Sequence, residues 1–272
     1  MIENELGNVP LFLGQLTSPE IMKFGENVRI AILAVGSIEQ HGSHLPIHTD
    51  YFTASNIAEQ GLRLAREKTS KPLAFIAPGI PYGGPGIGMT DWPGTICVRP
   101  TILMEFIKDI VDRLVFSGFD TLVILNGCVG NIPILSLTVG MLKDSHPKSN
   151  FILVEFASSL EEFNAHQRES AQGEMGHADE IETSIMLVLD PDHVHMSQAS
   201  RESINHPSSE VSWDYGAHNR FYWPENFKKM TKSGVIGNST FGTKEKGISI
   251  LNSSIERFSD ILIHINNSIE KK

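Results

Sequence analysis

The sequence has few cysteines and neither a long apolar run nor a basic one. Its only cysteines are Cys97 and Cys128, and two cysteines in 272 residues cannot form a disulfide framework. No apolar stretch is long enough to span a bilayer. The first ten residues, MIENELGNVP, lack the positively charged start of a signal peptide. These absences predict a cytoplasmic protein.

Positive charge is also scarce. The chain has 22 Lys and Arg residues against 32 Asp and Glu residues, a net charge of −10. This sign disfavours a general affinity for nucleic acid or for an anionic membrane. The hydrophobic content of 40% and the charged content of 20% are typical of a soluble globular enzyme. We therefore expect a small-molecule substrate, and neither nucleic acid nor membrane as a partner.

Apolar runs alternate with helical patterns along the chain. Four runs have the composition of buried strands, and four segments have helical spacing; the strands are expected at 28–35, 72–80, 121–127 and 151–156, and the helices at 51–68, 101–119, from about 131, and 243–271. Residues 173–187 look like a polar loop leading into a helix, and residues 197–242 like long ordered loops. The alternation predicts an α/β fold, a three-layer αβα sandwich with a mostly parallel central sheet. Without a repeat or linker, we expect one domain over residues 1–272.

The segment VGSIEQHGSHLPIHTD, residues 35–50, places metal-binding side chains directly after a buried strand. In extended backbone, residues two apart point to the same side, so Glu39 and His41 project together. Asp50 stands at the expected start of a helix, where the helix dipole favours a carboxylate, and its two oxygens can bridge two ions. His44 and His48 are weaker candidates that either support the ligands or are exposed. The segment predicts a site for divalent metal.

Two further segments are expected to reach the same site. Cys128 stands in NGCVGN, where the third predicted strand ends, and ligands bind beyond the carboxyl ends of strands in open α/β sheets. His177, Asp179, Glu180 and Glu182 lie together at the start of a predicted helix, in which Asp179 and Glu182 share one face. The candidate site therefore draws on three separate loops.

At these residues the sequence resembles the creatininase (creatinine amidohydrolase) family. The resemblance rests on VGSIEQHGSHLPIHTD, on NGCVGN where the family usually has N-G-H-x-x-N, and on GHADEIETSIML; DWPGTI and GVIGNSTFGTKEKG add to it. It covers about residues 28–250. It implies a sheet between helices, a binuclear metal site, a homohexamer, and hydrolysis of a C–N bond in a small, often cyclic amide.

The resemblance also implies roles for single residues. Glu39 would bind one ion, His41 the other, and Asp50 would bridge them. His177 matches the family's catalytic histidine, which exchanges protons with substrate and product. Glu182 would substitute for a missing ligand to the second ion, and we include it with His177 among the candidate catalytic residues.

Two positions depart from the family pattern. Cys128 stands where the family has a histidine ligand, and Gly130 where creatininase itself has a glutamate. A Cys128 thiolate would favour Zn²⁺ over Mn²⁺, with Mn²⁺ or Fe²⁺ as the alternative ions, whereas a non-ligating Cys128 would leave a site with one metal or none. We expect one or two ions per chain. Glycine at 130 argues against creatinine as the substrate.

Three other functions remain open at this stage. Some relatives hydrolyse a C–C bond to open the ring of a keto-sugar (an inosose), a reaction that also needs a polarised carbonyl and a proton donor. A non-catalytic binding protein could keep the fold, and Cys128 is the feature that favours it. Redox sensing by Cys128 would require an exposed thiol of lowered pKa.

Overall fold

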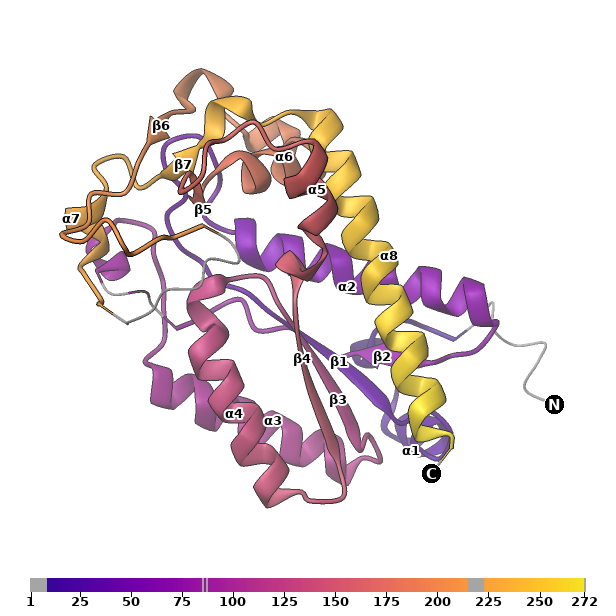
Figure 1. Ribbon diagram of the computed structural model, residues 1–272. Helices are drawn as coiled ribbons and strands as arrows, with labels where there is room; N and C mark the ends of the chain where they lie inside the picture. Colours follow the sequence, from indigo (N-terminus) through magenta and orange to yellow (C-terminus); the bar gives the residue numbers. More distant parts are fainter. Residues whose placement is uncertain (1–8, 85, 87, 215–222, 272) are drawn as a thin grey trace.

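A four-stranded parallel sheet forms the centre of the protein (Figure 1). The computed structural model describes residues 9–84, 86, 88–214 and 223–271. The strand order is β2-β1-β3-β4, and every neighbouring pair is parallel. The strands are β1 (Ile30–Val35), β2 (Ala74–Ile76), β3 (Thr121–Asn126) and β4 (Asn150–Glu155). The parallel sheet expected from the sequence is therefore confirmed.

Helices cover both faces of this sheet. Helices α2 (Thr49–Thr69) and α8 (Lys244–Ile269) lie on one face, and α3 (Pro100–Phe116) and α4 (Ile132–Ser145) on the other (Figure 1). Alternate residues of β1 enter two different cores: Ile30 and Ile32 pack with α2 and α8, whereas Ala31 and Leu33 pack with α3 and α4. A strand buried on both faces is apolar throughout, which is why its sequence was recognisable.

A second, smaller sheet forms where the sequence predicted only loops. Strands β5 (Met175–His177), β7 (Ile236–Asn238) and β6 (Arg201–Glu202) pair antiparallel in the order β5-β7-β6. The loop prediction was wrong here because strands of two or three residues are too short to show alternation. Gly237 has a φ of 145°, and a Cβ atom there would lie 2.7 Å from the Glu174 carbonyl oxygen. The small sheet places His177 close to the end of β1.

The remaining helices are short, and one of them carries part of the candidate site. They are α1 (Ser18–Gly25), α5 (Glu161–His166), α6 (Glu180–Leu189) and α7 (Phe227–Met230). Helix α6 packs against α8, where Lys246 Nζ lies 2.6 Å from Glu180 Oε1. Within the described ranges, no helix combines the length and the apolar character needed to cross a membrane.

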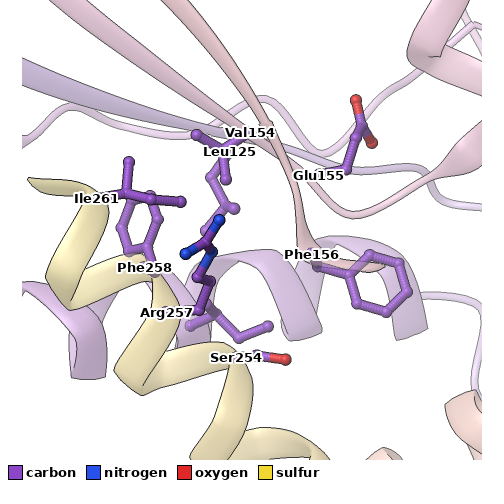
Figure 2. A pocket seen from close by; sticks show the side chains of 9 residues that line it. Leu125, Val154, Glu155, Phe156, Ser254, Arg257, Phe258 and Ile261 are labelled. Carbon is purple, nitrogen blue, oxygen red and sulfur yellow. The ribbon is translucent and has the colours of Figure 1, made fainter. Parts of the chain in front are cut away.

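A small crevice lies between α8 and the ends of β3 and β4 (Figure 2). Its apolar lining belongs to the core that packs against α2 and α8, and Glu155 and Arg257 complete the lining. None of the candidate metal ligands lines it. The crevice is therefore separate from the site that the sequence indicated.

Candidate metal centre

The segment after β1 brings Glu39 and His41 into a buried position. Glu39 is 3% exposed and His41 is fully buried. His41 Nδ1 lies 3.0 Å from the Glu39 carbonyl oxygen, which can only accept, so Nδ1 carries a proton. His41 Nε2 therefore faces the interior of the cluster. This is the usual way in which a backbone carbonyl orients a metal-binding histidine.

Asp50 lies in the first turn of α2, next to His41. One oxygen, Oδ1, is 3.0 Å from His41 Nε2. The other, Oδ2, is buried and has no hydrogen-bond partner in the part of the chain that the structure describes. Glu182 Oε2 lies 3.6 Å from the same His41 nitrogen. These three side chains form one compact group at the N-terminal ends of two helices.

Glu182 is held by the segment that precedes α6. Its Oε2 accepts a 2.6 Å hydrogen bond from the Ala178 N–H, and Ala178 has a φ of 50°, a strained value for a residue with a side chain. Asp179 does not join the cluster as a ligand: its carboxylate caps α6 by accepting from the N–H groups of Ile181 and Glu182. Glu180 instead pairs with Lys246. Of the three acids at this helix start, only Glu182 reaches the candidate site.

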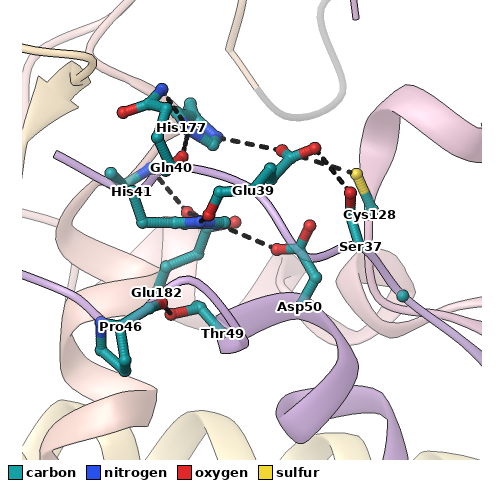
Figure 3. A network of polar contacts seen from close by, with 12 residues as sticks. Ser37, Glu39, Gln40, His41, Pro46, Thr49, Asp50, Cys128, His177 and Glu182 are labelled. Atoms are coloured by element: carbon teal, nitrogen blue, oxygen red, sulfur yellow. Dashed lines mark hydrogen bonds and ion pairs between the residues drawn. The ribbon is translucent and has the colours of Figure 1, made fainter. Parts of the chain in front are cut away.

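Cys128 and His177 approach Glu39 from two other elements (Figure 3). The Cys128 Sγ atom, just after β3, lies 3.8 Å from Glu39 Oε1. His177 Nδ1, at the end of β5, also lies 3.8 Å from Glu39 Oε1. Both side chains are buried. The three predicted loops therefore meet at one place.

The ligand atoms fall into three overlapping groups. In each group the atoms lie within 4.8 Å of one another, and the groups are Glu39, His41 and His177; Glu39, Asp50 and Cys128; and His41, Asp50 and Glu182. Asp50 belongs to two of them, with Glu39 in one and His41 in the other. The geometry is compatible with the two-ion arrangement implied by the family resemblance, while the ligand roles stay predictions.

The electrostatics of the cluster favour a bound cation. Burial and the neighbouring Asp50 raise the pKa of Glu39 to about 8. Burial alone would lower the pKa of His41, but Asp50 and Glu182 outweigh it and raise that pKa to about 10. Protons thus compensate the buried carboxylates, and divalent metal competes with protons for such ligands. The donor set, with its unpaired Asp50 oxygen, fits a divalent metal.

The two remaining groups behave differently. Burial, together with the charge on His41, lowers the pKa of His177 to about 4, so this ring is neutral at pH 7. Burial and the charges on Asp50 and Glu39 raise the pKa of the Cys128 thiol well above its usual value. A buried thiol of raised pKa is the opposite of a redox-sensing cysteine, which argues against that alternative.

Sequence reasoning left out two residues that contact the cluster. Ser37 donates a 2.7 Å hydrogen bond to Glu39 Oε2. The alternation that pairs Glu39 with His41 also places Ser37 on their side, so this residue could have been found. Gln40 contacts His177, and no local pattern indicates that contact.

The two weaker histidine candidates are now placed. His44 is fully buried, with Nε2 2.9 Å from Thr183 Oγ1, and it therefore supports the start of α6. His48 is partly exposed and pairs with Asp190 at 3.1 Å. In the part of the chain that the structure describes, neither belongs to a group of candidate ligands.

Comparison with known proteins gives consistent matches. A family model described as creatinine amidohydrolase matches residues 14–262. The mycofactocin precursor peptide peptidase of Mycolicibacterium smegmatis is 28% identical over 68% of this chain and 66% of its own. The creatinine amidohydrolase of Pseudomonas putida is 23% identical over 93% of this chain and 96% of its own. The chain thus spans about two thirds of the first relative and nearly all of the second.

A third relative and two solved structures extend the comparison. The 3-dehydro-scyllo-inosose hydrolase of Thermotoga maritima is 24% identical over 70% of this chain and 59% of its own. A creatininase variant in a zinc–zinc form has a TM-score of 0.76 at 20% identity, covering 94% of this chain and 98% of its own. A manganese creatininase has a TM-score of 0.73 at 21% identity, covering 93% of this chain and 98% of its own. The structural likeness supports the same fold.

Proposed function

The chain belongs to the creatininase (creatinine amidohydrolase) family of hydrolases, and from that premise we propose that it uses divalent metal to cleave a C–N bond in a small amide. The observation that carries the proposal is the position of Asp50. Its carboxylate lies in two ligand groups, and its Oδ2 atom is buried without a partner among the described residues. An unpaired buried carboxylate oxygen is costly, and a cation would satisfy it.

The ligand groups suggest how two ions would be held. Glu39 and Cys128 would bind the first ion, His41 and Glu182 the second, and Asp50 would contact both. When bound, the metal supplies a water nucleophile that is active at neutral pH and polarises the amide carbonyl. The thiolate of Cys128 would favour zinc, although solved creatininases include both zinc and manganese forms.

His177 is the residue placed to move protons. Its neutral ring has Nδ1 on the side of Glu39, 3.8 Å from Oε1, so Nδ1 can accept a proton from the nucleophile and return it to the leaving nitrogen. Glu182 stays a candidate for both a ligand role and a catalytic role. Its hydrogen bond with the Ala178 N–H also links the residue after His177 to the first turn of α6.

The relatives limit the class of substrate that we propose. The named relatives act on creatinine, on a precursor peptide and on an inosose. Gly130 argues against creatinine, so we propose another amide, cyclic or peptide-like. Ring opening of a keto-sugar is the second candidate, and the inosose hydrolase match favours it. We further propose a single domain over residues 1–272, a homohexamer and a cytoplasmic location.

The test combines metal analysis with substrate screening. Protein dialysed against zinc is expected to retain about two ions per chain, whereas Asp50→Ala is expected to lose both and remain folded. Asp190→Ala is the matched control, because Asp190 pairs with His48 outside the cluster. Hydrolysis is then measured on cyclic amides, short peptides and cyclic keto-sugars. Equal metal retention and turnover by the wild type and Asp50→Ala would contradict the proposal.

Cys128→His tests the departure from the family pattern. If the thiol is a ligand that tunes the site for zinc, the histidine variant should keep its metal content but bind manganese relatively better. If Cys128 is not a ligand, the variant should gain an ion. Unchanged metal preference and content would show that this position does not face the metals.

A further inference from the structure

Gln40 contacts His177 in a way that the proposed function does not yet use. It lies between Glu39 and His41 in the chain and is 5% exposed. Its backbone carbonyl oxygen is 2.7 Å from His177 Nε2, and its side-chain nitrogen is 3.1 Å from the same ring nitrogen (Figure 3). One residue therefore offers that nitrogen both an acceptor and a donor.

The orientation of the Gln40 amide is set by two other hydrogen bonds. Its Oε1 accepts from the Gly42 N–H at 3.0 Å, and its Nε2 donates to the Gly234 carbonyl oxygen at 3.1 Å. The nitrogen end therefore faces His177. One N–H of the amide is used by Gly234, and the other can point either to His177 Nε2 or to the Met89 sulfur 3.8 Å away.

These contacts satisfy both neutral forms of the His177 ring. A neutral imidazole has one N–H and one lone pair. With the proton on Nε2, the ring donates to the Gln40 carbonyl oxygen, and the free amide N–H turns to Met89. With the proton on Nδ1, the Nε2 lone pair accepts the amide N–H. In neither form is the buried Nε2 left without a partner.

The rest of the environment keeps the ring in place. The His41 ring lies 4.4 Å from the His177 ring, centroid to centroid. Phe227 packs edge-on at 5.2 Å, with an interplanar angle of 87°. Because the ring is held between these neighbours, a change of tautomer changes what Nδ1 offers on the Glu39 side without moving the ring.

We propose that Gln40 is a positioning residue that allows neutral His177 to present either a lone pair or an N–H at Nδ1. This inference rests on the proposed function, in which His177 first accepts a proton and later faces the leaving nitrogen. The shorter contact to the carbonyl oxygen makes the Nε2–H form the major one. The side-chain amide keeps the Nδ1–H form populated, because without it that form would leave a buried lone pair unsatisfied.

The test reads the tautomer directly. Full-length protein labelled with ¹⁵N-histidine is studied at neutral pH by two-bond ¹H–¹⁵N correlation, and the His177 signals are identified by their loss in His177→Gln. The wild type should give averaged shifts that are weighted towards Nε2–H. Gln40→Met should move them to the Nε2–H limit, with a fall in the Nδ1–H population on the order of tenfold. Gln167→Met, which removes a side-chain bond to Ser249 elsewhere, should leave them unchanged.

A second variant keeps the test valid if Gln40→Met does not fold. Gln40→Leu also lacks an N–H to donate and introduces no ionisable group next to His177, so it should shift the tautomer in the same direction. Wild-type shifts already at the Nε2–H limit, or an unchanged ratio in either folded variant, would overturn the inference.

The measurement is independent of the proposed reaction. A tautomer shift in a protein that hydrolyses no amide would refute the proposed function and leave the role of Gln40 intact.

Discussion

Metal binding should release a countable number of protons, because the candidate ligands hold protons at neutral pH. With pKa values of about 8 for Glu39 and about 10 for His41, the first group is about nine-tenths protonated at pH 7 and the second almost fully. Metal ligands bind in the deprotonated form. Binding through these two groups should therefore release about two protons per chain. Cys128, whose pKa is raised further, would add a third if it is a ligand.

The same values set the direction of the pH dependence. Both ligands must lose a proton, so affinity rises with pH. Lowering the pH from 8 to 7 should weaken metal binding about 50-fold through Glu39 and His41 together. A ligating Cys128 thiol would add about another tenfold. The pH dependence and the proton count therefore report on the same set of ligands.

Isothermal titration calorimetry with zinc in buffers of different ionisation enthalpy measures the proton count. Cys128→Ser should release one proton fewer than the wild type if the thiol binds metal. Cys97→Ser is the matched control, because Cys97 is in none of the candidate ligand groups found among the described residues. Release of less than one proton by the wild type, or an unchanged count in Glu39→Gln, would refute the reasoning that these buried groups hold the ion.

Three further predictions concern the stability of the fold. Burial, opposed by a hydrogen bond from Asn126, raises the pKa of Glu155 to about 7. The protonated Glu155 therefore stabilises the folded state fully below the unfolded pKa near 4.5, and this stabilisation is lost as the pH rises to 7. In urea titrations across this range, the free energy of unfolding of the wild type should fall by about 3 kcal/mol more than that of Glu155→Gln. Phe258 of α8 is 1% exposed in the core that α8 shares with α2. Its substitution by Ala should cost about 3–5 kcal/mol in chemical denaturation, and a cost below about 1 kcal/mol would contradict its place in that core. Lys246→Met removes the cation that pairs with the buried Glu180 carboxylate and leaves it only the N–H donors of Glu169 and Ser170. This change should cost about 3–5 kcal/mol, most of which Glu180→Gln in the same chain should restore.

The sheet was predictable because its strands carry their own signal. β1 and β3 are buried along their whole length, and continuous burial requires the apolar runs that the sequence shows. The helices were also predictable, with α2, α3 and α8 beginning and ending within about three residues of the expected positions. Strands β5, β6 and β7 were not, because so few residues carry no periodic pattern and their pairing joins segments far apart in the chain.

In the candidate site, too, some residues could be identified from local sequence and others only from the folded structure. Glu39, His41 and Asp50 stand in one segment whose spacing follows from extended backbone and a helix start, so local geometry could indicate them. Cys128 and Glu182 could be named as candidates, but only folding shows which of the neighbouring acids turns inward.

The sequence by itself determined the layered α/β fold and the kind of ligand atoms available, because burial and backbone geometry act on neighbouring residues. The tertiary structure alone decided that Asp179 caps a helix while Glu182 enters the cluster, and that Gln40 reaches His177. It also left Asp50 Oδ2 without a hydrogen-bond partner among the described residues. Those outcomes depend on distances between residues far apart in the chain, such as Gln40 and His177, which are separated by 137 positions. Such distances are set by packing of the whole chain, and no local pattern encodes them.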